Sequence, residues 1–204
     1  MILQRPPDAW AIYVLAPGAG GGIANGFMQS FAAALAEQGV ATLRHELRPT
    51  DPKPVRYARV RDAALKASAE RLPLFAGGKS FGGRMTSQAE ADEPLPGLRG
   101  IAFAGFPLHP PGKAGTSRAD HLQRVRVPML FMQGTRDEFA DLSLLEPIVA
   151  GLPQATLRLI EGADHSLRKA IGELAATFAA WARPLAQRPS GDSSSRASKS
   201  AGSR

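Results

Sequence analysis

The sequence contains no cysteine among its 204 residues. Disulfide bonds and cysteine-ligated zinc sites are therefore excluded. Long hydrophobic runs are also missing, since none approaches the roughly 20 residues that a helix needs to cross a bilayer. Residues 1–8 lack the apolar segment of a secretory signal. We therefore expect a cytoplasmic protein that does not associate with membranes.

Acidic residues are the scarcer charge, with 18 Asp and Glu against 25 Lys and Arg, a net charge of +7. Part of the excess lies in residues 188–204, a Ser- and Gly-rich stretch with four basic residues and one acidic residue. Such a stretch has too little apolar surface to offset the entropy of ordering, so we expect a disordered basic tail. It is either a weak electrostatic arm for RNA or an acidic surface, or an inert solvated end. We expect no nucleic-acid partner for the rest of the chain.

Residues 1–187 are expected to form one domain, because 44% of the sequence is apolar and a chain of this length buries about 70% of its unfolded surface. Apolar runs typical of buried parallel strands alternate with helical patterns. We predict strands at residues 10–16, 40–46, 72–76, 98–104, 127–133 and 156–160, and helices at residues 27–38, 57–71, 81–91, 142–150 and 169–185. The order predicts an α/β fold, a three-layer, doubly wound, mostly parallel six-stranded sheet.

Chemistry in such sheets lies beyond the carboxyl ends of the strands. After the third predicted strand stands Gly78-Lys79-Ser80-Phe81-Gly82, which fits the G-x-S-x-G nucleophile elbow. Glycine at 78 and 82 is expected to prevent side chains from colliding across a sharp strand-to-helix turn. Ser80 would then stand at a helix N-terminus, which favours developing negative charge. The alternative is a glycine-rich turn with a helix-capping serine.

Two nucleotide motifs overlap these glycines. The end of a P-loop resembles Gly78-Lys79-Ser80, but that motif needs glycine at position 73, which is Pro73 and has no N–H for a phosphate. The loop after the first strand hints at a dinucleotide fingerprint, yet its third glycine would fall at Ile23. We reject the first and keep the second as a minor alternative.

Two further polar residues follow later strands. Asp137 comes after the fifth predicted strand, and His165 lies in a loop after the sixth. Ser, Asp and His then occur in the chain order of an α/β-hydrolase triad. Asp164 is adjacent to His165, and neighbouring side chains rarely face each other, so Asp137 is the preferred acid and Glu138 the reserve. An ordinary turn aspartate and a solvated histidine remain the simpler alternatives.

Taken together, several motifs resemble the α/β-hydrolases, in particular a small lidless group related to dienelactone hydrolase, and also the hydrolase-like domain of a chromatin-complex subunit. These motifs are Pro17-Gly18-Ala19-Gly20-Gly21, Gly78-Lys79-Ser80-Phe81-Gly82-Gly83-Arg84, Phe106-Pro107-Leu108-His109-Pro110-Pro111-Gly112-Lys113, Gly134-Thr135-Arg136-Asp137 and Gly162-Ala163-Asp164-His165. Many relatives have His-Gly where this chain has Pro17-Gly18, a change that leaves backbone donors intact.

The resemblance implies acyl transfer to water without a cofactor or a metal. His165 would deprotonate Ser80, and Asp137 would hold the imidazole in the useful tautomer. The backbone N–H groups of Ala19 and Phe81 would form the oxyanion hole. The expected substrate is a small ester or thioester.

The segment at residues 105–126 limits that substrate, because it is too short for a separate cap domain, and buried long acyl chains need an apolar cavity. Pro107 and His109 either line the pocket or stiffen a surface loop. Basic residues near the proposed triad, namely Lys79, Arg84 and Arg136, either favour an anionic substrate or form a solvated rim.

Three functions from different classes stay open. The first is a serine hydrolase. The second is a catalytically idle hydrolase fold that acts as a protein-interaction module, because fold does not fix function. The third is a nucleotide- or nucleic-acid-binding protein that depends on the basic tail.

Overall fold

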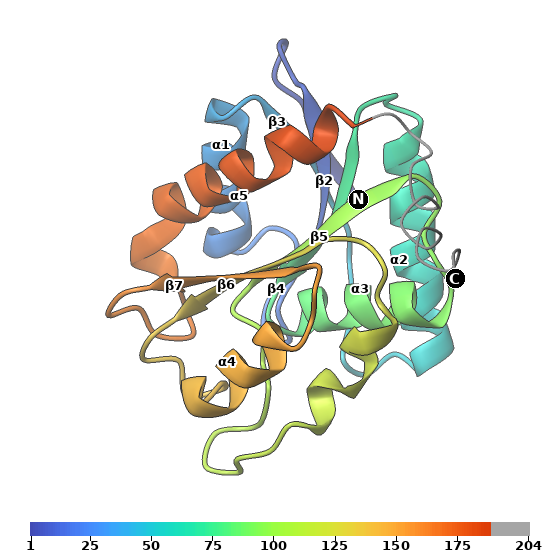
Figure 1. The fold of residues 1–204 in the computed structure, drawn as a ribbon. Coiled ribbons are helices and arrows are strands. Elements are labelled where there is room, and N and C mark those ends of the chain that lie inside the picture. Colours follow the sequence, from blue (N-terminus) through green and yellow to red (C-terminus); the bar gives the residue numbers. More distant parts are fainter. Residues whose placement is uncertain (189–204) are drawn as a thin grey trace, which may run out of the picture.

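The structure, a computed structural model, describes residues 1–188. A seven-stranded sheet has the order β1-β3-β2-β4-β5-β6-β7 and lies between two layers of helices (Figure 1). All neighbouring strands are parallel except the pair of β1 and β3. The strands are β1 (Ile2–Gln4), β2 (Ala11–Ala16), β3 (Val40–Arg44), β4 (Leu74–Lys79), β5 (Leu98–Ala104), β6 (Met129–Gly134) and β7 (Ala155–Ile160). The predicted three-layer, doubly wound architecture is confirmed.

The predicted strand number, six, is wrong by one. The additional strand is β1, which pairs antiparallel with β3 at the sheet edge. Ile2 and Leu3 are 38% and 44% exposed, so this strand buries neither face fully. Without a buried face, three residues carry no alternating pattern that a sequence reading detects.

Helices cover both faces of the sheet (Figure 1). Residues of β2 alternate between two apolar clusters: Ile12 and Val14 belong to one, Tyr13 and Leu15 to the other. Helices α2, α3 and α4 supply the first cluster, and α1 and α5 supply the second. The helices are α1 (Gly26–Glu37), α2 (Lys53–Ser68), α3 (Phe81–Asp92), α4 (Leu142–Ala150) and α5 (Ile171–Ala186), with short 3₁₀ helices η1 (Ser117–Arg124) and η2 (Arg168–Ala170).

Helix α2 begins four residues before the predicted start at residue 57. Pro54 lies in its first turn, where the missing N–H costs nothing because first-turn N–H groups have no partner inside the helix. The cluster of prolines predicted a loop, but the last of them belongs to the helix. Within residues 1–188, no helix is long and apolar enough to cross a membrane.

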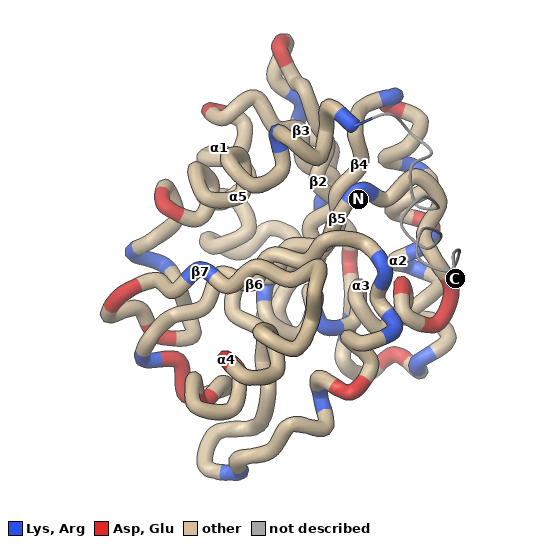
Figure 2. The backbone as a smooth tube through the Cα atoms, viewed as in Figure 1, with Lys and Arg blue, Asp and Glu red and all other residues tan. Residues whose placement is uncertain are grey.

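The strand order places the two glycine-rich turns side by side. The chain leaves β2 toward β3 on one side, whereas β4 pairs with β2 on the other side. The loops after β2 and β4 therefore meet at the point where the strand order reverses, which is where open α/β sheets bind ligands. In the view of Figure 2, basic and acidic residues are interspersed around the periphery.

The buried His121 on η1 makes stability depend on pH. Burial, and then the charges of Arg84 and Arg124, lower the pKa of His121 to about 4. The unfolded chain then binds this proton at a higher pH than the folded protein does, so stability is lost as pH falls from about 6.5 to about 4.

We expect that His121→Asn loses less unfolding free energy than wild type between pH 7 and pH 4.5, by about 1–3 kcal/mol. Urea unfolding at both pH values measures the difference. Part of the acid loss should remain, because burial also lowers the pKa of His45 to about 4. Equal acid losses in the two proteins would contradict this assignment.

Candidate active site

Ser80 stands alone between β4, which ends at Lys79, and α3, which begins at Phe81. Its backbone angles are φ 48° and ψ −114°, a conformation that residues other than glycine seldom adopt. Its N–H donates to the carbonyl of Ala104 on β5, and its own carbonyl accepts the N–H of Arg84 in α3. The predicted strand–serine–helix turn is present.

The flanking glycines are required by their close approach to the end of β2. A Cβ on Gly78 would lie 2.2 Å from the carbonyl oxygen of Ala16, and a Cβ on Gly82 would lie 2.5 Å from the carbonyl oxygens of Ala16 and Pro17. The collision at each position is thus with the end of β2. The collision of side chains at 78 and 82 across the turn stays a prediction. The missing side chains let α3 approach the neighbouring strand closely enough to set the turn.

Three side chains from separate loops form one hydrogen-bonded chain. Ser80 Oγ lies 2.8 Å from His165 Nε2, and His165 Nδ1 lies 2.8 Å and 2.9 Å from the two carboxylate oxygens of Asp137. The Asp137 side chain is fully buried, whereas the His165 side chain is 15% exposed. Because a carboxylate only accepts, Nδ1 carries a proton, and in the neutral ring Nε2 is free to accept from the Ser80 hydroxyl.

Further contacts fix Asp137. Gln133 Nε2 donates to Asp137 Oδ2 at 2.6 Å, and the Phe139 N–H donates to Oδ1 at 2.8 Å. The Phe139 ring stacks on the His165 ring with centroids 4.1 Å apart. Sequence reasoning missed Gln133 and Phe139; the only signal was their position, four residues before and two after the predicted acid.

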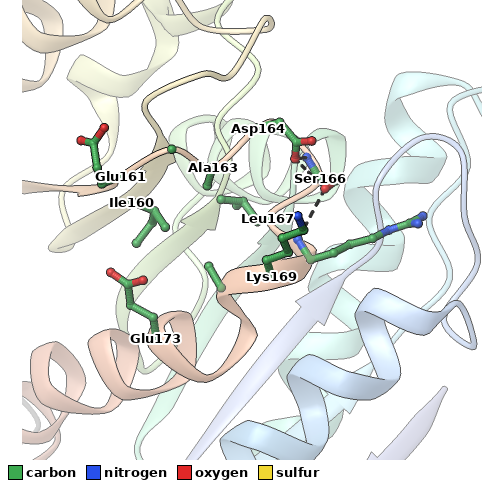
Figure 3. Close-up of a pocket in the computed structure, with 11 residues that line it drawn as sticks. Ile160, Glu161, Ala163, Asp164, Ser166, Leu167, Lys169 and Glu173 are labelled. Atoms are coloured by element: carbon green, nitrogen blue, oxygen red, sulfur yellow. Dashed lines mark hydrogen bonds between the residues drawn. The ribbon is translucent and has the colours of Figure 1, made fainter.

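The carboxylates of the residues adjacent to His165 and Asp137, Asp164 and Glu138, do not contact the His165 ring. Asp164 Oδ1 accepts the N–H and the hydroxyl of Ser166 at 2.9 Å and 2.6 Å (Figure 3). Figure 3 shows Asp164 turned toward Ser166. Both residues line a cavity of about 380 Å³ together with residues of η2 and Glu173 of α5. Glu138 is exposed. The reasoning that preferred Asp137 to its neighbours agrees with this arrangement.

A cleft of about 280 Å³ opens beside Ser80 and His165. The loop at residues 18–20, including Ala19, lines one side, and the rings of Phe27 and Phe139 also face it. A Cβ on Gly18 would lie 3.9 Å from Ser80 Cβ, so this loop packs directly against Ser80. Phe81 is the first residue of α3, where N–H groups have no partner within the helix.

Charge around the cleft differs from the expected set. Its lining contains Lys79 and Arg168 and, among the described residues, no acidic side chain. Arg136 is exposed and lies outside this lining, as does Arg84. Burial, and then the charges of Arg118 and Arg56, lower the pKa of Arg84 to about 10. Arg84 therefore lies among other arginines beside α3.

A second serine–histidine pair lies on α3 and η1. Ser87 Oγ is 2.7 Å from His121 Nε2, and the Ser87 hydroxyl donates to the carbonyl of Arg84 at 3.0 Å. The Ser87 hydroxyl is thus within hydrogen-bond distance of both the Arg84 carbonyl and His121 Nε2. Both residues are buried, so this pair ties η1 to α3 and has no access to substrate.

The segment between β5 and β6 contains only η1 within residues 105–126. His109 is 7% exposed; its Nδ1 donates to the Pro110 carbonyl and its Nε2 accepts the Asp141 N–H, each at 2.9 Å. Asp141 caps α4. Of the two predicted roles, the structure supports a stiffened loop, because neither His109 nor Pro107 lines the cleft.

Residues 9–183 match a family described as an alpha/beta hydrolase domain. The match spans most of the chain, and the chain therefore belongs to this α/β-hydrolase family.

Solved structures agree on the fold. Those similar to this chain include a serine hydrolase homologue from Coxiella burnetii, at 18% identity and TM-score 0.71, covering 88% of this chain and 89% of that chain. A serine hydrolase without lid from Xanthomonas campestris has 22% identity, TM-score 0.68 and coverages of 92% and 89%. A dienelactone hydrolase from Anabaena variabilis has 20% identity, TM-score 0.70 and coverages of 89% and 89%. The expected resemblance to a chromatin-complex subunit is not shown by these comparisons.

Gly82 offers a direct test of the close approach to β2. We expect Gly82→Ala to destabilise the fold by about 3 kcal/mol or more, because two backbone oxygens must move. Gly172→Ala in α5 is the matched control: its Cβ meets nothing within 4 Å, so it should stabilise by up to about 1 kcal/mol. Chemical unfolding of both variants measures this. Similar stability in the two variants would refute the steric argument.

Proposed function

We propose that this protein is a serine hydrolase that cleaves a small ester or thioester. The observation that carries the proposal is the hydrogen-bonded chain from Ser80 through His165 to Asp137. His165 accepts the hydroxyl proton as Ser80 attacks the carbonyl carbon, and Asp137 stabilises the imidazolium that forms. His165 then returns the proton to the leaving alcohol or thiol. Water, deprotonated by His165, hydrolyses the acyl-enzyme.

The oxyanion of each tetrahedral intermediate would accept hydrogen bonds from the N–H groups of Phe81 and Ala19. Support comes from the position of Phe81 in the first turn of α3, where the helix dipole adds positive potential, and from Ala19 on the wall of the cleft. Donors of this kind are worth roughly a hundredfold or more in rate each.

The size of the cleft supports a short acyl group. It measures about 280 Å³, and the segment between β5 and β6 adds only η1 above the sheet edge. Two aromatic rings, Phe27 and Phe139, suit a small apolar or aromatic acyl group.

The second candidate function is a catalytically idle fold that serves as a protein-interaction module. An idle scaffold has no need for the buried carboxylate that Gln133 and Phe139 orient toward His165, and these contacts favour the enzyme. The nucleic-acid role depends on the disordered basic tail predicted at residues 188–204, of which residues 189–204 lie outside the described residues.

Covalent labelling with a fluorophosphonate tests the nucleophile. Wild type should react and Ser80→Ala should not, while His165→Gln and Asp137→Asn should slow ester hydrolysis by about 10³-fold or more. Ser87→Ala is the matched control, since it breaks the other serine–histidine pair and should still be labelled. Folded wild-type protein that resists the probe would favour the idle module.

The basic lining of the cleft generates a second test. Between two esters that differ only in a carboxylate on the acyl group, we expect kcat/KM to be about tenfold higher for the charged one, equivalent to about 1.4 kcal/mol. Arg168→Met should reduce this preference and leave the neutral ester less affected. No preference for the charged ester would mean that Lys79 and Arg168 do not select substrates.

A further inference from the structure

Lys79 is a partly buried cation that connects two parts of the candidate site. It is the last residue of β4 and directly precedes Ser80. Its Nζ donates a hydrogen bond of 2.5 Å to the backbone carbonyl of His165, 86 residues further along the chain. The strand that presents the nucleophile is thereby tied to the loop that presents the base.

The ammonium group also lies close to the buried part of the triad. A Cβ built on Gly105 would lie 3.3 Å from Lys79 Nζ, 3.4 Å from Asp137 Oδ2 and 3.5 Å from His165 Nδ1. Cation, carboxylate and imidazole therefore surround one point, and Gly105, at φ +72°, leaves that point empty. A side chain there would be strained by the positive φ and would press most closely on Lys79 Nζ.

We propose that Lys79 is a positioning residue, which holds the backbone at His165 so that the imidazole meets Ser80. The inference deepens the proposed hydrolase function and rests on it. Contacts of Asp137 and Phe139 hold the ring of His165, whereas Lys79 holds its main chain.

We call the hydrogen bond from Lys79 to the His165 carbonyl the clamp. It matters because His165 lies in a loop between β7 and η2. Gly162 and Ala163 of this loop are tied to the segment after β6, because the Gly162 N–H donates to Thr135 Oγ1 at 2.8 Å and the Ala163 carbonyl accepts the N–H of Arg136 at 2.9 Å. Lys79 restrains the loop further along, at His165 itself. A displacement of about 1 Å at a catalytic group can cost roughly a hundredfold in rate. A hydrogen bond from a charged donor is stronger than one between neutral groups, so the single side chain of Lys79 is enough to restrain the loop.

The charge of the clamp depends on pH. Burial lowers the pKa of Lys79 to about 8, partly opposed by the negative charges of Asp137, Asp164 and Glu138. His165 and Arg168 face the same cleft, and α1 contributes the Phe27 ring, 5.7 Å from Nζ. As pH rises through about 8 the ammonium becomes a neutral amine, and its hydrogen bond to the carbonyl weakens. An alkaline decline in kcat follows.

Kinetics on a neutral ester, p-nitrophenyl acetate, test this role without substrate charge. We expect Lys79→Met to lower kcat about 10–100-fold with KM within about twofold of wild type. Lys79→Arg should keep a larger part of kcat and should lack the alkaline decline, because guanidinium stays charged. The matched control is Arg136→Met, which removes an exposed cation next to Asp137 and should behave like wild type.

Proton NMR of ¹⁵N-histidine-labelled protein gives a readout independent of turnover. In wild type, the Nδ1 proton between His165 and Asp137 should exchange slowly with water, and in Lys79→Met it should exchange faster or broaden. If wild type hydrolyses no ester, the proposed function fails, while this signal still tests the clamp. Lys79→Met with an unchanged Nδ1 signal, or with wild-type kcat from pH 6 to pH 10, would overturn the inference.

Discussion

The contact on which the site depends is between the turn after β4 and the end of β2. Gly78 and Gly82 both approach the backbone of Ala16 so closely that neither position has room for a methyl group. This approach sets the start of α3 and holds Ser80 in a strained conformation above the sheet edge. It also places the loop after β2 directly against Ser80. Packing between backbone atoms, without any charged side chain, thus sets the position of Ser80.

The two serine–histidine pairs in this fold have different surroundings, and the surroundings distinguish a candidate catalytic pair from a structural one. Ser80 keeps its hydroxyl proton for His165, because Asp137 holds the other ring nitrogen as a donor. Ser87 Oγ lies against both a backbone carbonyl in its own helix and His121 Nε2, and among the described residues no carboxylate is hydrogen-bonded to the His121 ring. Distances of 2.8 Å and 2.7 Å are nearly the same, so distance alone does not identify a nucleophile.

Local signals in the sequence were enough for the class of fold and for the residues that meet at the sheet edge. Glycines around Ser80, an apolar run before it and a helix after it are all close neighbours in the chain. Contacts between distant segments left no such trace. The partner of Gly78 is a strand some sixty residues earlier, the carbonyl held by Lys79 lies 86 residues later, and the Phe139 ring stacks on a histidine in another loop. These pairings depend on strand order and register, which no short motif encodes.

The short N-terminal strand has a consequence for assembly. Unpaired edge strands act as templates for pairing with other chains, and longer edges are better templates. Strand β1 has three residues and covers β3, which has five. The sheet therefore ends on a shorter strand on this side. A chain that begins after β1 would leave the amides of β3 open to intermolecular strand addition, with aggregation as the result.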